Sequence, residues 1–329
     1  MRQFSYSRPA DEKSAIEEVS HRKTTQFLAG GTLLIDLMKL DVARPERLVD
    51  INKLPFAEVK THGGGVFIGT LVRNSDLANN QLIRQRYPVL SQAILSGASA
   101  QIRNVATTGG NILQRTRCPY FRDTTMACNK REPGSGCPAI DGYSRMHAIF
   151  GGSDDCVAVH PSDMCIALLA LDAIVHTSGD DGERKIPFEE FHLVPGRTPQ
   201  YETVLRPGEL IVGVELPPSK FAAHAHYLKV RDRNSFSFAL VSVAACLQLD
   251  GKTIGDARIT LGGVATKPWR LRDCEKALIG KSVGKETFAA AASAGIKSAK
   301  PLKYNKFKVE LTRRSIARAL EIAAAGGVS

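Results

Sequence analysis

Apolar and polar residues follow one another along this chain in short blocks that predict both strands and helices. Short apolar runs bounded by turn-forming residues predict strands at 25–29, 47–51, 65–69 and 173–176. Apolar residues at helical spacing predict helices over 32–40, 87–97 and 163–171. The first half of the chain therefore combines short strands with short helices.

A second group of elements begins near Ala223. It is expected to contain a strand at 226–231, an apolar run over 238–249, a strand at 256–264 and helices over 273–279, 285–299 and 308–325. The intervening residues 179–220 are rich in Gly and Pro, which predicts a connector of strands and turns. The chain of 329 residues has room for about two domains, and it contains no run of 18 apolar residues that would predict a membrane-spanning helix.

Residues 115–155 lack apolar periodicity and are rich in Pro, Gly, Arg and Asp. A loop of about forty residues is uncommon in a compact domain and usually has a function. Four cysteines lie in this region or directly after it: Cys118, Cys128, Cys137 and Cys156. Three more, Cys165, Cys246 and Cys274, lie in apolar or helical contexts and are predicted to be buried as small apolar residues.

The spacing of the four clustered cysteines, C-x9-C-x8-C-x18-C, is compatible with more than one kind of chemistry. Structural zinc sites usually draw on C-x2-4-C pairs, which this loop lacks. Disulfides are expected only in an oxidising compartment. A cubane iron–sulfur cluster needs four thiolates, and a long irregular loop can wrap around it. On the residues alone, an iron–sulfur cluster, a zinc site and a loop without metal stay open as alternatives.

Two further features of the loop favour a cluster. Cys118–Pro119 and Cys137–Pro138 resemble the Cys-Pro pairs of many cluster loops, where Pro stiffens the backbone of the ligand. A 4Fe–4S core with four thiolates is anionic, so nearby cations would offset its charge. The loop contains such cations: Arg115, Arg117, Arg122, Lys130, Arg131 and Arg145.

The whole chain is basic, with a formal net charge of +11. Such a balance is typical of proteins that bind nucleic acid, an anionic cofactor or an acidic partner. No zinc-finger or RNP signature supports nucleic-acid binding. The basic stretch from Lys297 to Arg318 is predicted to form a solvated helix face. Residues Met1 to Tyr6 lack the apolar core of a secretory signal, so a cytoplasmic location is expected, or a periplasmic one by export with a signal-bearing partner.

Two glycine-rich segments, Ala29–Thr32 and Thr107–Asn111, have the composition of an anion site. A strand–Gly–Gly–helix turn leaves backbone N–H groups free at a helix N-terminus, which suits a pyrophosphate. Neither segment is a G-x-G-x-x-G motif or a P-loop, and each alone is more typical of an ordinary turn or helix start. Together they could grip one extended dinucleotide from two sides.

Other candidate residues are ambiguous by themselves. Asp163 follows Ser162 at a predicted helix start, where an N-cap is as good an explanation as a ligand contact. Lys229 lies in a strand of alternating charge and would by default be exposed. No HExxH motif and no Ser/His/Asp constellation is evident, so no catalytic residue is predicted.

Five segments, taken in order, resemble the FAD-binding medium subunit of the xanthine dehydrogenase and aldehyde oxidoreductase family, and the similar subunit of carbon monoxide dehydrogenase. They are Phe27–Leu34, Arg103–Ile112, Pro161–Asp163, Pro207–Ile211 and Lys229–Arg231. The resemblance implies an α+β fold, with a FAD-binding domain at 1–219 of the PCMH or vanillyl-alcohol-oxidase type. That domain would have subdomains at about 1–58 and 59–219 and an iron–sulfur insertion at 115–158. An α+β flavoprotein C-terminal domain would follow at 220–329.

The cysteine loop resembles one branch of that family in particular. Most medium subunits lack such a loop, whereas the FAD subunit of bacterial periplasmic aldehyde oxidoreductases has one. By this resemblance Cys118, Cys128, Cys137 and Cys156 would be the ligands of a 4Fe–4S cluster. The medium subunit of 4-hydroxybenzoyl-CoA reductase has a comparable loop and is the nearest alternative.

The same resemblance implies roles for the residues around FAD. The first turn would wrap the pyrophosphate with Phe27, Leu28, Ala29, Gly30, Gly31, Thr32, Leu33 and Leu34. The second would hold its other side with Thr107, Thr108, Gly110 and Asn111. Asp163 would contact the adenosine or ribityl hydroxyls, and Ile211 and Lys229 would lie near the isoalloxazine.

The function implied by the resemblance is electron relay in a heterotrimer. A large partner subunit with a molybdenum cofactor would oxidise an aldehyde, and a small partner with 2Fe–2S clusters would pass the electrons to FAD and the 4Fe–4S cluster of this chain, which delivers them to an external acceptor. This chain alone is not expected to oxidise aldehydes. The alternatives are a xanthine dehydrogenase-like or 4-hydroxybenzoyl-CoA reductase-like enzyme, a self-contained flavin oxidoreductase, and a zinc-binding scaffold.

Overall fold

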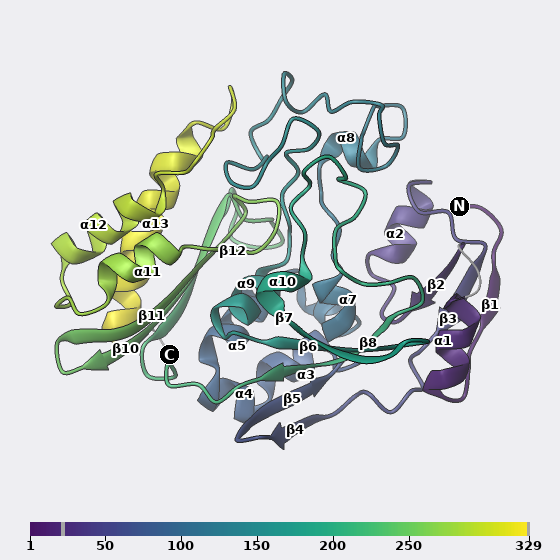
Figure 1. The fold of residues 1–329 in the computed structure, drawn as a ribbon, viewed down its shortest axis with the longest axis horizontal. Helices are drawn as coiled ribbons and strands as arrows, with labels where there is room; N and C mark the ends of the chain where they lie inside the picture. The colour runs from purple at the N-terminus through teal and green to yellow at the C-terminus, as the bar shows by residue number, and fades with distance from the viewer. Residues whose placement is uncertain (21–23, 328–329) are drawn as a thin grey trace.

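The computed structural model describes residues 1–20 and 24–327. A small parallel sheet forms the N-terminal unit (Figure 1), in which β3 (Arg47–Asp50) lies between β1 (Ser5–Ser7) and β2 (Thr25–Leu28). α1 (Glu12–Ser20) packs on this sheet through the buried side chains of Ala15 and Ile16. α2 (Leu34–Lys39) begins soon after β2 ends, so the Gly30–Gly31 turn connects a strand directly to a helix.

The central sheet is antiparallel. Its strands, in spatial order, are β4 (Val59–His62), β5 (Gly65–Gly69), β8 (Leu210–Leu216), β6 (Ile174–Gly179) and β7 (Gly182–Pro187). Helices pack around it: α3 (Asn74–Asn79), α4 (Gln81–Arg86), α5 (Pro88–Ser96), α6 (Ala100–Arg103), α7 (Thr108–Ile112), α9 (Asp163–Ala170) and α10 (Phe188–Phe191). All eight residues of α9 are buried, because this helix lies inside the core between the central sheet and the C-terminal sheet.

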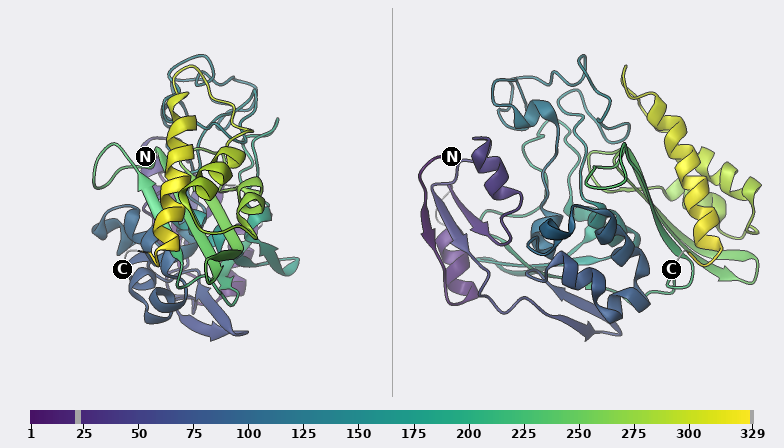
Figure 2. Two further views of the ribbon diagram at one scale, coloured as in Figure 1. Left: turned by 90° about the vertical axis from the view of Figure 1, so that its left-hand side faces the viewer. Right: turned by 180° about the vertical axis from the view of Figure 1, so that it is seen from behind.

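The C-terminal sheet is also antiparallel. Its strands follow the order β12 (Trp269–Arg270), β11 (Thr253–Gly262), β10 (Val241–Asp250) and β9 (Ala225–Val230). Three helices cover one of its faces (Figure 2): α11 (Arg272–Leu278), α12 (Lys285–Gly295) and α13 (Phe307–Ala324). The other face rests on α5 and α9, and therefore β10 is buried along most of its length.

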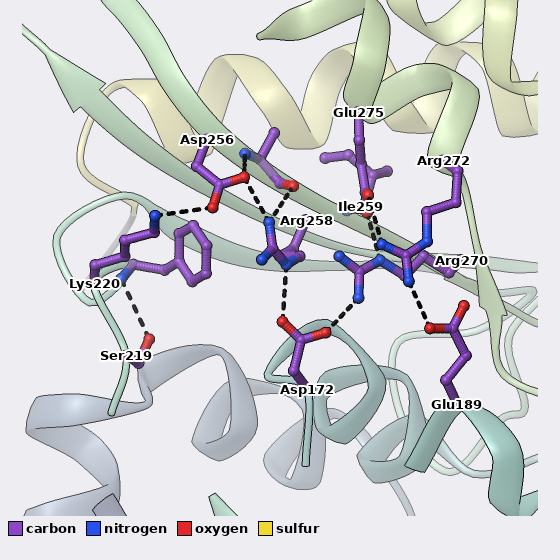
Figure 3. Close-up of polar contacts among 12 residues, drawn as sticks. Asp172, Glu189, Ser219, Lys220, Asp256, Arg258, Ile259, Arg270, Arg272 and Glu275 are labelled. Carbon is purple, nitrogen blue, oxygen red and sulfur yellow. Dashed lines mark hydrogen bonds and ion pairs between the residues drawn. The ribbon is translucent and has the colours of Figure 1, made fainter. Parts of the chain in front are cut away.

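Ion pairs fasten the central part of the chain to the C-terminal sheet (Figure 3). The carboxylate of Asp172, directly after α9, accepts a hydrogen bond from Nε of Arg258 at 2.9 Å and also binds Arg270. Nε of Arg270 donates to Glu275 of α11 at 2.8 Å, so one guanidinium joins two carboxylates. Arg272 pairs with Glu189 of α10 beside this network.

The architecture confirms the predicted α+β class and the main predicted elements, with ends shifted by a few residues. Three predictions were wrong in detail. The helix expected over 285–299 ends at Gly295, the Thr107–Asn111 segment is the start of helix α7 rather than a turn, and the long loop contains the short helix α8 (Pro119–Arg122). Within the part of the chain that the structure describes, no helix is both long and apolar enough to cross a membrane.

Candidate functional site

A cavity of about 980 Å³ runs from the N-terminal sheet, past α7 and the start of α9, to the tip of the β9–β10 hairpin. This volume is at the upper end of what small-molecule and cofactor sites occupy. The residues predicted to hold FAD line it, with the exception of Thr108. The cavity thus brings together segments that lie about 200 residues apart in the sequence, from Phe27 to Lys229.

The first glycine turn forms one wall of the cavity. A Cβ on Gly30 would come within 2.2 Å of the carbonyl oxygen of Val105, so only glycine lets this turn pack against the second one. Gly31 has a φ of +69°, which glycine adopts without strain. Among the hydrogen bonds of the described residues, the backbone N–H groups of Gly30, Gly31 and Thr32 have no protein acceptor. Free amides at the start of a helix are suited to a phosphate oxygen.

The second glycine segment faces the first. Thr107 is the N-cap of α7 and accepts a hydrogen bond from the amide of Gly110 at 3.3 Å. Thr108 turns away from the cavity, because its hydroxyl donates to the carbonyl of Val72 at 3.1 Å. The side chain of Asn111 lies on the cavity and accepts from Ser162 at 2.6 Å. Thr108 therefore stabilises the segment and is not a contact residue of the cavity.

Asp163, Lys229 and Tyr227 form a buried polar triad at the far end of the cavity. Nζ of Lys229 lies 2.7 Å from Oδ2 of Asp163 and also donates to the carbonyl of Ser96 at 2.9 Å. The hydroxyl of Tyr227 donates to Oδ1 of Asp163 at 2.7 Å. Burial, assisted by the Asp163 carboxylate, raises the pKa of Tyr227 well above its usual value.

The triad corrects the expectation that Lys229 is exposed, and it shows what the carboxylate of Asp163 binds. The Lys229 side chain is only 4% exposed, so the expectation of an exposed strand residue was wrong. The reason is tertiary, since β9 packs on α5, which covers the side chain. Ser162 is the N-cap of α9 and accepts from the amide of Cys165, which leaves the Asp163 carboxylate to bind Lys229 and Tyr227.

The four clustered cysteines line one small cavity inside the long loop. All four thiols are free, so no disulfide joins them. Burial raises the pKa of Cys118 to about 12 and that of Cys156 to about 11, while backbone amides directed at the sulfurs act in the opposite sense. The donors toward Cys118 are the amides of Phe121 and Tyr120. Four thiols around one cavity match in number and type the thiolates that hold a 4Fe–4S cluster.

Most cations of the loop are paired with carboxylates, contrary to the simple expectation that they offset a cluster. Arg115 and Lys130 both bind Glu202. Two others, Arg117 and Arg122, bind Asp36 of α2. Arg145 binds Asp232, whereas Arg131 donates to backbone carbonyls of the loop. These pairs tie the loop to both flanking units and reduce its net positive charge.

Two residues near the cysteines were not singled out by the sequence. Nε2 of His147 lies 3.2 Å from Sγ of Cys118, and burial lowers the pKa of this imidazole to about 4. Lys308 is fully buried, and its Nζ donates to the carbonyls of His147 and Gly263. The expectation that the basic C-terminal stretch is entirely solvated was therefore wrong at Lys308. A lone histidine in an irregular loop gave no signal in the sequence.

A second group of buried donors surrounds the carbonyl of Ile112, at the end of α7. Ring nitrogens of His160 and His192 and the thiol of Cys165 come within 4.8 Å of one another. His192 contacts the carbonyl through Nε2 at 3.0 Å, and Cys165 lies 3.9 Å from it. Burial lowers the pKa of His192 to about 4, so a neutral ring donates to this acceptor. The shared carbonyl accounts for the approach of His192 and Cys165, whereas Nδ1 of His160 accepts from the amide of Ser162 at 3.4 Å.

Comparison with known proteins gives matches over nearly the whole chain. Residues 2–219 match the FAD binding domain in molybdopterin dehydrogenase, and residues 225–323 match the CO dehydrogenase flavoprotein C-terminal domain. The aldehyde oxidoreductase FAD-binding subunit PaoB of Escherichia coli (strain K12) is 49% identical, over 97% of this chain and 98% of that protein. The glyceraldehyde dehydrogenase medium chain of Sulfolobus acidocaldarius is 28% identical, over 88% and 86% of the two chains. A solved structure of carbon monoxide dehydrogenase from Hydrogenophaga pseudoflava superposes with a TM-score of 0.78 at 26% identity, and the match covers 99% of both chains.

Proposed function

Because this chain belongs to the family of FAD-binding medium subunits of molybdenum hydroxylases, we propose that it is the electron-transfer subunit of a molybdenum-dependent aldehyde oxidoreductase and holds a 4Fe–4S cluster beside its FAD. Family membership makes it an oxidoreductase subunit that binds FAD. One observation carries the finer part of the proposal: four free cysteines line one cavity, and only residues 113–117 separate the first of them from the end of α7.

The proposed FAD site is the large cavity. The free amides of Gly30, Gly31 and Thr32 would bind the pyrophosphate, with Thr107, Gly110 and Asn111 on its other side. Asp163, Ile211 and Lys229 would surround the remainder of the cofactor at the far end of the cavity. Bound FAD supplies a centre that accepts electrons singly and releases them as a pair.

The proposed cluster ligands are Cys118, Cys128, Cys137 and Cys156. A 4Fe–4S cluster supplies a one-electron centre whose potential depends on the surrounding charge and hydrogen bonds. The chain would fix the thiolates in place through the loop amides, and it would exclude water because Cys128 and Cys156 are buried. A structural zinc site is less well supported, since no C-x2-4-C pair is present.

The domain boundaries belong to this proposal. A FAD-binding domain at 1–219 would comprise the N-terminal and central sheets, with the cluster loop at 115–158 inserted in it, and a C-terminal domain at 220–329 would comprise the last sheet and its helices. Because Lys229 and Tyr227 lie on β9 and Asp163 lies on α9, the proposed FAD site includes side chains from both domains.

The proposed partners are a large subunit with the molybdenum cofactor and a small subunit with 2Fe–2S clusters. The relative that is 49% identical is named as a FAD-binding subunit of an aldehyde oxidoreductase, which supports an aldehyde as the substrate of the assembled enzyme. The alternative is an assembly like 4-hydroxybenzoyl-CoA reductase or like xanthine dehydrogenase. Turnover of the assembled enzyme with an aldehyde, with an aromatic thioester and with a purine distinguishes the three. We place the assembly in the cytoplasm, or in the periplasm by export with a partner.

An absorption spectrum of the anaerobically purified complex, with iron, sulfide and flavin quantified, tests the proposal. The expected result for each copy of this chain is one FAD, and about four irons in addition to those of the 2Fe–2S clusters in the small partner. Replacement of Cys137 with Ser should lower the iron content and leave FAD in place. Replacement of Cys274, a buried thiol of α11 that does not line the loop cavity, with Ala is the matched control and should change neither. Stoichiometric zinc, or a colourless complex, would contradict the proposal.

A second measurement tests the division of labour between the subunits. The isolated chain loaded with FAD should not oxidise aldehydes, because in the proposed assembly the molybdenum cofactor of the large partner subunit oxidises the substrate and this chain relays the electrons. Addition of the two partner subunits should restore turnover with an artificial acceptor. Full aldehyde oxidation by the isolated chain would show that it is a self-contained flavin oxidoreductase instead.

A further inference from the structure

The imidazole of His147 is directed at one of the four proposed cluster ligands. We propose that His147 donates its Nε2–H to Sγ of Cys118 and thereby raises the reduction potential of the cluster. This inference rests on the proposed function, because it requires a cluster in the cysteine cavity. It adds a positioning residue that is not itself a ligand.

The contact has the geometry of a hydrogen bond to sulfur. The Nε2–Sγ distance is 3.2 Å, and His147 is only 3% exposed, so water does not compete for the sulfur at this point. In the part of the chain that the structure describes, no other side chain makes a hydrogen bond to any of the four clustered thiols. The remaining donors that face these sulfurs are backbone amides, which no substitution of a side chain removes. His147 is therefore the one adjustable donor in the described surroundings of the cavity.

The C-terminal domain holds His147 in place. The backbone carbonyl of His147 accepts from Nδ2 of Asn305 at 3.1 Å and from Nζ of Lys308 at 3.2 Å. Both side chains are fully buried, and burying a lysine is costly unless its ammonium is well coordinated. The amide of His147 donates to the carbonyl of Ser144 at 3.0 Å. These contacts fix the backbone from which the ring reaches Cys118.

His147 also lies on the side of the cysteine cavity that faces the proposed FAD site. A further cavity, of about 230 Å³, is lined by Cys118 and His147. Asp163 and Phe238, which line the large FAD cavity, also line this one. Cys118 is thus a ligand on the flavin side of the cluster, where its charge matters most for exchange of electrons with FAD.

The direction of the effect follows from charge. Reduction adds one negative charge to the cluster and its thiolates, and an N–H donor stabilises the more negative state more strongly. Loss of the donor should therefore make the midpoint potential more negative. With the proton on Nε2, the other nitrogen, Nδ1, carries a lone pair, and it is buried without a partner among the described residues.

Redox titration of the complete complex, followed by the EPR signal of the reduced cluster, tests the proposal. The variant His147→Phe should keep its iron, sulfide and FAD and have a more negative midpoint potential than the unaltered enzyme. The variant His147→Gln, whose amide can still donate, should lie closer to the unaltered value. The control His226→Phe removes a half-buried histidine of β9 and should leave the potential unchanged. An unchanged potential in a fully loaded His147→Phe complex would overturn the proposal.

A measurement on the unaltered enzyme covers the case in which His147→Phe fails to retain iron. The complex is prepared with ¹⁵N-labelled histidine, and pulsed EPR of the reduced cluster is recorded. A weak histidine nitrogen coupling is expected from a hydrogen bond to a ligand sulfur. A strong coupling would mean that His147 is itself a ligand, and no coupling would mean that the bond is absent. Either result overturns the inference, whereas an unaltered complex without iron would refute the proposed function itself.

Discussion

Removal of the Lys229–Asp163 ion pair should reveal how strongly the two domains are coupled at the proposed FAD site. The side chain of Lys229 is 4% exposed and that of Asp163 is 9% exposed, so water compensates little when either charge loses its partner. Loss of one member of a buried pair typically costs about 3–5 kcal/mol. The carbonyl of Ser96 still coordinates Lys229, and Tyr227 still donates to Asp163, so we expect the lower end, about 3 kcal/mol, for Asp163→Asn and for Lys229→Met.

The assay is urea unfolding followed by the fluorescence of Trp269, the single tryptophan. Trp269 stacks on Phe150 at a ring distance of 5.8 Å, so its emission reports contact between the C-terminal sheet and the end of the cluster loop. The double variant removes both charges and should cost less than the sum of the two single variants, by about 2 kcal/mol. The reasoning fails if the destabilisation of the double variant equals the sum of the two single destabilisations to within about 0.5 kcal/mol. In that case the two charges do not stabilise each other.

Three further predictions concern the turn, acid stability and the domain contact. Gly30→Ala should weaken FAD binding, measured as flavin retained after dialysis, because the added Cβ would meet the carbonyl of Val105. The control Gly284→Ala should not weaken FAD binding, because Gly284 has a φ of 172° and open space around it. Burial alone would raise the pKa of Asp50, but hydrogen bonds from Tyr6, Asn52 and Arg8 lower it to about 2. The stability that the ionised Asp50 gives to the fold is thus complete above pH 3.8 and is lost as the pH falls through about 2. Asp50→Asn should therefore flatten the dependence of the urea midpoint on pH in that window. Asp172→Asn should lower the free energy of unfolding by about 1 kcal/mol, a small amount because the Asp172 side chain is half-exposed. An unchanged urea midpoint would argue against a stabilising role for the network in Figure 3.

Local chemistry was predictable from the sequence where the backbone requires a particular residue. The Gly30–Gly31 turn could be identified because its position between a strand and a helix demands glycine. The buried state of Cys165, Cys246 and Cys274 followed from their apolar neighbours and is confirmed by the structure. The buried helix α9 was placed correctly because its residues form a continuous apolar run.

What escaped prediction depends on partners far away in the chain. Lys229 is buried because its Nζ binds Ser96, 133 residues earlier, and no local pattern reports that contact. Lys308 lies in a lysine-rich stretch that predicts a solvated helix, yet its Nζ binds the carbonyl of His147 in the cluster loop and that of Gly263. The direction of the buried Thr108 side chain, away from the cavity, and the approach of His147 to Cys118 likewise depend on tertiary packing rather than on spacing.

The two ends of the long loop are tied together at its base. Ser162, directly after the loop, donates its hydroxyl to Oδ1 of Asn111, directly before it, at 2.6 Å. The base is thereby closed whatever lies between, and the helices α7 and α9 on either side keep their mutual position. The length of the loop can therefore differ without separating α7 from α9, whereas any shorter loop would still have to supply the carbonyl that coordinates Asn305 and Lys308.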